Sequence, residues 1–208
     1  MTDCDPLRLF LHWEGLVRLA TEPYVSPLPS NLQNLYMHLT NYAINKEHAN
    51  FEYNQCAGDF FAGHKRSFQA LLEHLHAAGT DTDKLWGQIC NIVAKVVCMI
   101  QPWLAQLYRS VQISDGSNRM CFQLLGFDVL FDHTLRPFLL EVNQAPSFTC
   151  DTPLDSFVRE AVVRDTLQLL GLRNGNRERH LSEMHHRFIE RSKFKASSSS
   201  ELFPSLST

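Results

Sequence analysis

Phe122–Phe148 reads FQLLGFDVLFDHTLRPFLLEVNQAPSF, and this stretch decides the fold of the chain. Two strongly apolar segments flank a polar turn that contains Asp, Arg and Pro, residues that favour turns. The pattern predicts strands over Cys121–Phe131 and Phe138–Asn143. Because so few residues separate them, we expect the two strands to form a β-hairpin.

Three oxygen-bearing side chains interrupt these apolar segments: Asp128 in the first, and Glu141 and Asn143 in the second. Glu141 and Asn143 are two residues apart, so they project from the same face of a strand. A four-residue loop over residues 133–136 would place Asp128 directly opposite Glu141, with the two Cβ atoms about 5 Å apart. A slip of one residue in the register would destroy this arrangement.

Two carboxylates that face each other on an apolar ribbon repel, and burial would raise the pKa of at least one of them. A divalent cation would remove the repulsion. Two carboxylates and an amide oxygen, without Cys or His nearby in sequence, suit Mg²⁺, which usually keeps waters and binds substrate phosphates. The alternative is a hairpin whose Asp and Glu lie on a solvated face. The spacing alone does not decide between the two.

The composition is that of a globular protein with a core. The chain has 208 residues, of which 44% are hydrophobic and 11% aromatic. Its net charge of −3 gives no sign of nucleic-acid binding. Residues 172–208 hold seven Lys and Arg against four Asp and Glu, so this tail is net +3 and the remainder is net −6. The six cysteines form no C-x-x-C pair, and no apolar run suggests a membrane span, so we expect a reduced cytosolic protein.

Periodicity predicts several further elements. The expected strands are Leu7–His12, Gly15–Leu19 and a buried Leu35–Leu39, with an irregular Pro-rich loop over residues 21–30 and a polar loop over residues 45–66. Three helices are expected. The first is capped by Ser67, the second covers Asp83–Ile100 and ends before Pro102, and the third covers Phe157–Leu170 and ends at Gly171. A polar turn is expected over residues 112–119. A basic helix carrying Leu181, Met184 and Phe188 follows, and the Ser-rich end from Ser197 is expected to be disordered.

Two strings, MHLTNYAINK (residues 37–46) and LEVNQAPSF (residues 140–148), resemble the tubulin–tyrosine ligase-like family. CDPL (residues 4–7) and EGLVRLAT (residues 14–21) look like it too. The likeness covers residues 3–171 in order and is greatest to the polyglutamylase branch, which attaches glutamates to side-chain carboxylates of tubulin tails. It implies an α+β, ATP-grasp-like fold with a mixed or antiparallel sheet and flanking helices, in which ATP and Mg²⁺ lie between two lobes.

The resemblance also implies roles for single residues. Asp128, Glu141 and Asn143 match the family's magnesium ligands, and Thr40 and Asn41 match its nucleotide-contacting pair. Without the family, a Thr-Asn pair is more often ordinary turn chemistry.

Four more residues match substrate contacts. Arg18 matches an active-site arginine that is suited to stabilise the oxygens of a tetrahedral intermediate, although alone it would be a surface charge. Tyr42, Lys65 and Arg159 fall where similar glutamylases contact glutamate, together with Arg18. Because this region contains an apparent insertion, either Lys65 or Arg66 aligns with the basic substrate contact of similar glutamylases. Arg159 stands where a lysine is usual, and in isolation it reads as an exposed helix charge.

Taken together, these matches predict an ATP- and Mg²⁺-dependent ligase that adds free L-glutamate to the acidic C-terminal tails of tubulin through an acyl-phosphate. We expect residues 1–171 to be the C-terminal part of the catalytic domain, with the N-terminal lobe missing and the chain inactive alone. Residues 172–195 would be a basic helical extension that grips microtubules or is merely solvated, and residues 196–208 a disordered tail.

The expected protein is monomeric, binds neither nucleic acid nor membrane, and lies in the cytoplasm on the microtubule cytoskeleton, the cilium or the basal body. Two alternatives stay open. One is a non-catalytic microtubule-binding remnant of the same fold, and the other is a related ligase that adds another amino acid or uses another acceptor.

Overall fold

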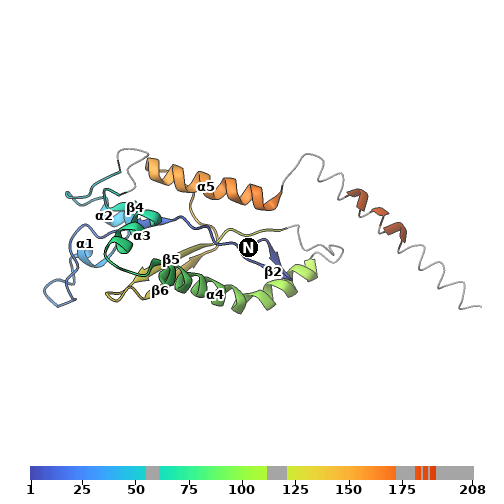
Figure 1. Ribbon diagram of the computed structural model, residues 1–208, viewed down its shortest axis with the longest axis horizontal. Coiled ribbons are helices and arrows are strands. Elements are labelled where there is room, and N and C mark those ends of the chain that lie inside the picture. Colours follow the sequence, from blue (N-terminus) through green and yellow to red (C-terminus); the bar gives the residue numbers. More distant parts are fainter. Residues whose placement is uncertain (55–60, 112–120, 172–180, 184, 187, 191–208) are drawn as a thin grey trace, which may run out of the picture. The chain divides into compact units, whose positions relative to one another are not determined.

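A computed structural model describes residues 1–54, 61–111, 121–171, 181–183, 185–186 and 188–190 (Figure 1). The chain divides into two units, residues 1–164 and residues 165–208. The elements in chain order are β1 (Asp3–Cys4), β2 (Leu7–Arg8), β3 (Leu16–Arg18), α1 (Leu35–His38), α2 (Tyr42–Asn45), β4 (Lys65–Ser67), α3 (Phe68–Ala77), α4 (Thr82–Val111), β5 (Gly126–Phe131), β6 (Pro137–Asn143) and α5 (Pro153–Leu170). The strands pair into three two-stranded antiparallel sheets, β1-β2, β3-β4 and β5-β6, so the chain is a mixture of helices and small antiparallel sheets.

The predicted hairpin is confirmed as β5 and β6, which begins at Gly126 rather than at Cys121. Asp128 pairs with Glu141 as predicted, but the predicted loop is wrong. Phe131 pairs with Pro137, so five residues form the connection, and the register shifts between Asp128 and Val129. The shift leaves one extra residue on β6, a β-bulge that restores the Asp128–Glu141 pair.

Asp132 explains the longer connection. Its Oδ1 accepts hydrogen bonds from Thr134 N at 2.8 Å, Thr134 Oγ1 at 2.6 Å and Arg136 N at 3.0 Å. The hydrogen bond from the Thr134 hydroxyl is the largest cause that lowers the pKa of Asp132. Leu135 completes the turn with a left-handed φ of 62°. A carboxylate that binds its own turn in this way closes a wider loop than the strand pattern suggests.

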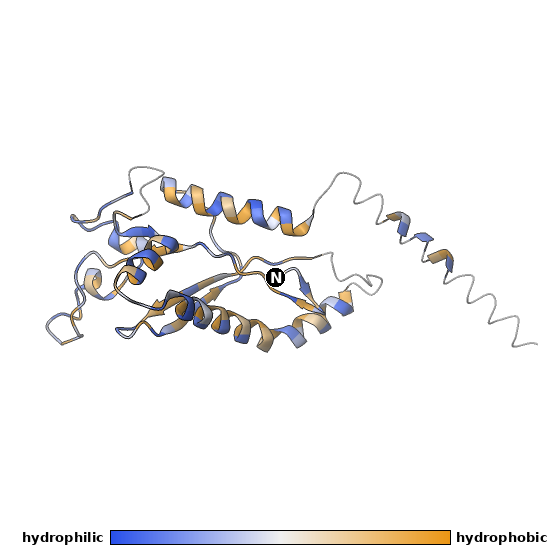
Figure 2. Ribbon diagram, in the orientation of Figure 1, coloured by the Kyte–Doolittle hydropathy of each residue, from blue (hydrophilic) through white to orange (hydrophobic). Residues whose placement is uncertain are grey.

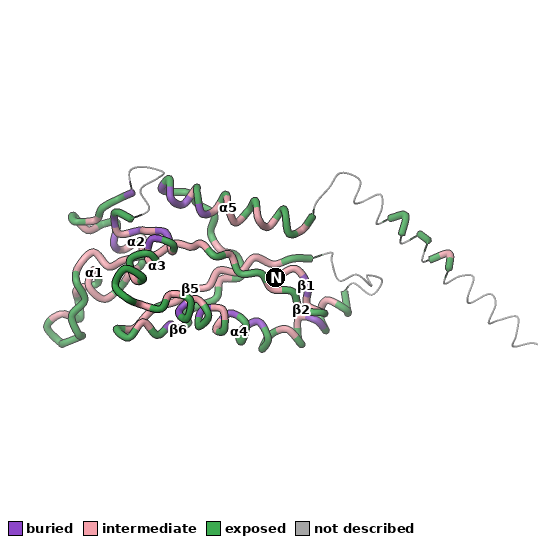
Figure 3. Tube along the Cα trace, viewed as in Figure 1, coloured by how far each residue is buried: buried purple, intermediate pink, exposed green. Residues whose placement is uncertain are grey.

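Helix α4 supplies most of the core. Leu85, Ile89, Val93 and Val97 recur every four residues and are buried, and Figures 2 and 3 show apolar and buried residues along this helix. Elsewhere in the described ranges, the buried apolar side chains are Ala70, Ala105, Leu154 and Val158. Ile100, the last residue of the predicted helix, is exposed although it is apolar. By length and composition alone α4 could cross a membrane, contrary to expectation, and 22% of its most apolar 18-residue window is buried.

The prediction that Pro102 ends this helix is wrong, because α4 continues to Val111. Pro102 lies on the exposed side of the helix, between the exposed Met99 and Trp103. The carbonyl that loses its donor at a proline can therefore be solvated, which lowers the usual cost of an internal proline. The preceding residue, Gln101, ties the helix to β1, because its Nε2 donates to Cys4 O at 2.6 Å.

The buried strand predicted at Leu35–Leu39 is also wrong. Residues 35–38 form the short helix α1, and Leu35 is exposed. Four or five apolar residues fit one helical turn as well as a strand, so periodicity cannot separate the two. In the N-terminal segment, Leu7–His12 shortens to β2, and Gly15–Leu19 becomes β3.

Helices α3 and α5 have ends that match common capping motifs. Ser67 accepts from Ala70 N at 3.0 Å and begins α3, as predicted. Helix α5 begins at Pro153, four residues earlier than predicted, and Gly171 follows its end with φ of 59°. The described residues between 181 and 190 are helical, with Leu181 and Phe188 exposed. Met184, the Ser-rich end and the predicted turn at residues 112–119 lie outside the described residues.

Candidate functional site

The three candidate magnesium ligands lie on one face of the β5-β6 hairpin. Asp128 pairs with Glu141, and Gly126 pairs with Asn143, so all four positions share a face. Asn143 Nδ2 donates to Glu141 Oε1 at 3.0 Å. A Cβ at Gly126 would lie 3.1 Å from Pro146 Cβ, so the missing side chain lets the turn after β6 close over the strand. The hairpin therefore brings the predicted ligands together.

These donors suit a hard cation. Two carboxylates and one amide oxygen on an accessible face offer three oxygens and leave room for water and phosphate, as Mg²⁺ requires. Within the described part of the chain, no group of three or more His, Cys, Asp or Glu side chains is placed to hold a metal ion. The candidate site therefore depends on the amide of Asn143 as well as on its two acids.

Arg18 reaches this face from β3. Its Nη2 donates to Asp128 Oδ2 at 2.8 Å, and both side chains are partly exposed. An exposed ion pair of this kind contributes about 0–1 kcal/mol to stability. Its main effect is geometric, because it places a guanidinium directly beside a candidate metal ligand.

Arg18 also lies directly opposite Lys65 in the β3-β4 pair. Two like charges at such a position normally destabilise a sheet. Here each cation has its own carboxylate, since Arg18 pairs with Asp128 and Lys65 pairs with Asp155. Arg66 pairs with Val17 and so projects from the other face, where its Nε donates to Gly63 O at 3.0 Å. The geometry therefore favours Lys65 over Arg66 as the partner of Arg18.

The Lys65–Asp155 pair is buried, with side chains 7% and 0% exposed. Lys65 Nζ donates to Asp155 Oδ2 at 2.7 Å, and Oδ1 lies equally near but accepts no well-directed hydrogen bond. Burial is the largest single influence on the pKa of Asp155 and raises it, but the hydrogen bond and charge of Lys65, with help from Thr152 and Arg159, lower it overall. Asp155 is therefore an anion at neutral pH.

Tyr42 and Arg159 complete this cluster. Lys65 Nζ lies 4.3 Å from the centre of the Tyr42 ring, within the range of a cation–π contact. Burial, followed by the charges of Asp151, Tyr53 and Asp155, raises the pKa of Tyr42, so the phenol is neutral. Arg159 Nη2 lies 3.8 Å from Asp155 Oδ1, and the Arg159 side chain is only 19% exposed. The alternative prediction that Arg159 is only an exposed charge on a helix is therefore wrong.

Thr40 and Asn41 lie between α1 and α2, not at the end of a strand as predicted. Asn45, which is 1% exposed, fixes this turn: its Nδ2 donates to Leu39 O at 2.8 Å and Asn41 O at 3.1 Å. Its Oδ1 accepts from the backbone N and hydroxyl of Thr21, three residues after Arg18. Thr40 and Asn41 connect to the rest of the cluster through Tyr42, the next residue in the chain.

The family model described as the "Tubulin-tyrosine ligase family" matches residues 1–179 of this chain. The chain belongs to the tubulin-tyrosine ligase family. Relatives of the chain include proteins named as tubulin polyglutamylases. A "Probable beta-tubulin polyglutamylase" of Tetrahymena thermophila is 45% identical over 170 residues, which are 82% of this chain and 14% of that protein.

Two mammalian members are similar over most of the chain. "Tubulin polyglutamylase TTLL7" of Mus musculus is 41% identical over 88% of this chain and 20% of its own length. "Tubulin polyglutamylase TTLL13" of Mus musculus is 42% identical over 92% of this chain and 23% of its own length. The chain thus spans about a fifth of the length of these relatives.

The sequence patterns do not indicate two residues that hold this candidate site together. Asp155 was hidden because the predicted helix began after it, although Thr152-Pro153-Leu154-Asp155 has the form of a capping box with Pro at the first helical position. Asn45 falls at the start of the predicted loop over residues 45–66, whereas the structure places it in α2. A polar residue one turn after Asn41 is the signal that could have indicated a helix–turn contact.

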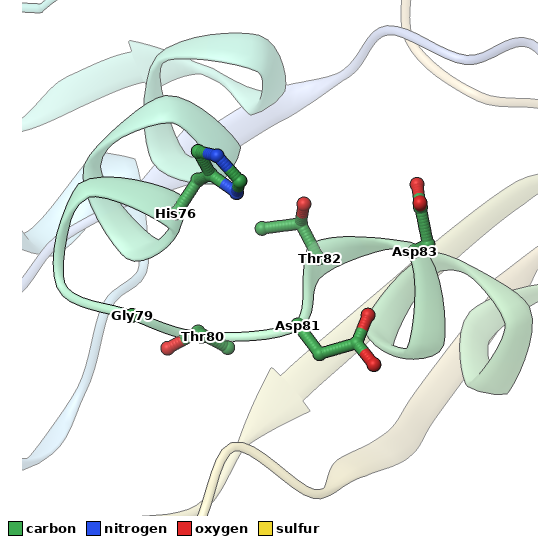
Figure 4. A pocket seen from close by; sticks show the side chains of 6 residues that line it. All are labelled: His76, Gly79, Thr80, Asp81, Thr82 and Asp83. Atoms are coloured by element: carbon green, nitrogen blue, oxygen red, sulfur yellow. The ribbon is translucent and has the colours of Figure 1, made fainter.

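A depression elsewhere in the fold does not belong to this site. It has a volume of about 350 Å³ and is lined by His76, Gly79, Thr80, Asp81, Thr82 and Asp83 at the turn between α3 and α4 (Figure 4). Asp81 Oδ1 accepts from Lys84 N at 3.0 Å, which is ordinary capping at the start of α4. None of the candidate site residues lines it.

Proposed function

We propose that this chain is the magnesium- and amino-acid-binding part of an ATP-dependent ligase that adds L-glutamate to side-chain carboxylates of tubulin C-terminal tails. One observation carries the proposal. A continuous series of charged and polar side chains runs from Arg159 through Asp155 and Lys65 to Arg18, and from there through Asp128 to Glu141 and Asn143. This series puts cations for an acidic substrate beside oxygens for a metal.

Each group has a chemical task in this proposal. Asp128, Glu141 and Asn143 would hold Mg²⁺, which supplies neutralisation of phosphate charge when bound. Lys65 and Arg159 would bind a carboxylate of the incoming glutamate, with Tyr42 packing on Lys65. Thr40 and Asn41 would present a hydroxyl and an amide to the nucleotide.

The reaction we infer has two steps. A carboxylate oxygen of the acceptor attacks the γ-phosphorus of ATP, which forms an acyl-phosphate and releases ADP. The amino group of glutamate then attacks the acyl carbon, the carbon–oxygen bond to phosphate breaks, and the amine loses a proton as the amide forms. Arg18 donates from a fixed guanidinium to the oxygens of the tetrahedral intermediate.

The charges of the amino-acid subsite persist through the neutral range. Asp155 stays ionised because its pKa is lowered, and Tyr42 stays neutral because its pKa is raised. Glycine has no side-chain carboxylate for an additional cation. Because the described cluster holds Arg18, Lys65 and Arg159, glutamate is the better-matched amino acid.

The surrounding architecture is proposed on the same basis. Residues 1–171 would be part of an ATP-grasp catalytic domain whose other lobe holds ATP phosphates. Residues 172–195 would be a basic extension that attracts the acidic microtubule surface, with a Ser-rich tail over residues 196–208. The protein would act as a monomer on cytoplasmic, ciliary or basal-body microtubules.

The substitution Glu141→Gln in the full-length protein tests the proposal. Wild-type protein with tubulin, ATP, Mg²⁺ and L-glutamate should give tubulin tails heavier by glutamyl residues in mass spectra, and Glu141→Gln should abolish this product. The matched control is Glu73→Gln, which removes an exposed carboxylate on α3 that contacts only Gln69 among the described hydrogen bonds. Near-normal activity of Glu141→Gln would contradict the metal role.

Thermal unfolding measures Mg²⁺ binding independently of enzymatic turnover. Mg²⁺ should raise the Tm of the wild-type protein and of Glu73→Gln, and it should have little effect on Glu141→Gln, because a ligand stabilises only the state that binds it. A wild-type protein that binds microtubules but transfers no glutamate would instead support a non-catalytic member of the same fold.

A further inference from the structure

Helix α5 begins with a carboxylate that serves two elements. Asp155 Oδ2 accepts from Thr152 N at 3.0 Å, Thr152 Oγ1 at 2.9 Å and Asp151 N at 3.2 Å, which ties down the start of the helix. The same oxygen accepts from Lys65 Nζ at 2.7 Å on β4. Asp155 therefore joins the capping box of α5 to the strand that faces Arg18.

Two cations converge on this one carboxylate. Lys65 Nζ lies 2.7 Å and Arg159 Nη2 lies 3.8 Å from Asp155 Oδ1, so the two nitrogens are no further apart than the sum of these distances, 6.5 Å. The one negative charge of Asp155 meets the two positive charges of Lys65 and Arg159, and the carboxylate of Asp151 lies near Tyr42. Arg159 Nη1 is also buried, with no hydrogen-bond partner in the described ranges of the chain. Asp155 alone therefore does not balance both cations, and Arg159 Nη1 is an available donor for one more carboxylate.

Capping alone does not account for Asp155. A hydroxyl or an amide can cap a helix without burying a charge. Asp155 is 0% exposed, and taking an ion pair out of water costs free energy that the pair often does not recover. A buried charge at this position needs a reason besides the helix, and the arrangement of Lys65 and Arg159 supplies it.

We propose that Asp155 is a positioning residue, which holds Lys65 and Arg159 around a common point so that both bind one carboxylate of the incoming amino acid. This inference rests on the proposed function, because it assigns the anchor of that function's amino-acid subsite. Lysine and arginine side chains lose much rotamer freedom when a ligand orders them. A carboxylate that fixes both in advance removes part of that cost.

The test compares Asp155→Asn with Thr152→Ala in the full-length protein. Asparagine keeps an acceptor for the Thr152 backbone but removes the charge, whereas Thr152→Ala removes the capping hydroxyl and keeps the charge. Asp155→Asn should raise the KM for glutamate at least about tenfold and leave the KM for ATP within about twofold, since breaking a buried charge pair disturbs its direct partners most. Thr152→Ala should lower the Tm and leave both KM values close to wild type.

Equilibrium dialysis with radiolabelled L-glutamate gives a reading independent of turnover. The same weakening by Asp155→Asn is expected there. A folded Asp155→Asn protein with wild-type glutamate affinity would overturn the inference, and so would equal KM increases in Asp155→Asn and Thr152→Ala, because Asp155 would then act only as a cap.

The two proposals can fail separately. A wild-type protein that binds glutamate but incorporates none refutes the proposed ligase, while the effect of Asp155→Asn on binding still decides the role of Asp155. A wild-type protein that neither binds nor incorporates glutamate overturns both.

Discussion

Replacing Lys65 by methionine should destabilise the protein more than any substitution of an exposed candidate residue. Methionine keeps most of the side-chain volume but removes the ammonium that lies 2.7 Å from the fully buried Asp155. Removing one partner of a buried ion pair costs about 3–5 kcal/mol. Thr152 and Asp151 still donate to Asp155, and Arg159 stays nearby, so we expect the lower end, about 3 kcal/mol.

The expected fall in Tm follows from the size of the unit. A domain of about 150–250 residues loses about 2–4 °C per kcal/mol, so Lys65→Met should lower the Tm of this domain by about 6–12 °C. The matched variant is the double substitution Lys65→Met with Asp155→Asn. Because it leaves no unpaired charge buried, its loss should be smaller than the sum of the two single losses. Differential scanning calorimetry of the full-length proteins at pH 7 measures all four Tm values.

The pH dependence gives an independent check of the same pair. The pKa of Asp155 is lowered from 3.8 in the folded protein, so its stabilisation is complete above pH 3.8 and is lost as the pH falls through the lower folded value. The Tm difference between wild type and Lys65→Met should therefore be largest at neutral pH and shrink below pH 3.8. A Lys65→Met protein that melts within about 2 °C of wild type at pH 7, or a difference that grows in acid, would refute a buried Lys65–Asp155 pair.

Two other substitutions probe the segments that carry the site. Asn45→Ala should cost about 2–4 kcal/mol in urea unfolding, because Thr21 N and Leu39 O lose their partner. The same substitution should weaken ATP binding more than glutamate binding, and an unchanged ATP affinity would argue against a nucleotide role for this turn. Gly63→Ala should cost about 2 kcal/mol, since Gly63 has a φ of +76° and an added Cβ would lie 2.8 Å from Glu52 O. A stability equal to wild type would show that the chain before Lys65 can relax.

The hairpin shows how far sequence reasoning reaches. Apolar patterning gave both strands and the Asp128–Glu141 pair, because the side-chain alternation of a strand is a local property. The predicted loop is one residue too short, because Asp132 accepts hydrogen bonds from its own turn and is part of the connection. A bulge on β6 compensates for the longer loop, so Asp128 still pairs with Glu141. The predicted pairing of Asp128 with Glu141 is therefore correct, although the predicted four-residue loop is wrong.

The errors at Leu35–Leu39 and Pro102 have a common cause. A five-residue apolar run fits a strand or a helical turn, and surrounding contacts choose between them. An internal proline leaves one backbone carbonyl without its donor, and it ends a helix where water cannot reach that carbonyl. Pro102 is exposed in α4, and this position depends on which face of the helix the core covers. Neither choice is visible in a short window of sequence.

The sequence by itself determined the hairpin, the facing oxygen ligands, the capped and amphipathic helices and the motifs of the tubulin-tyrosine ligase family, because these depend on residues close together in the chain. The tertiary structure alone decided that Arg18 faces Lys65 and that Asp155 pairs with Lys65. Lys65 and Asp155 are 90 residues apart, and Arg18 and Asp128 are 110 residues apart. No local period links such residues, and the physical reason they meet is that β3 pairs with β4 while buried charges require partners.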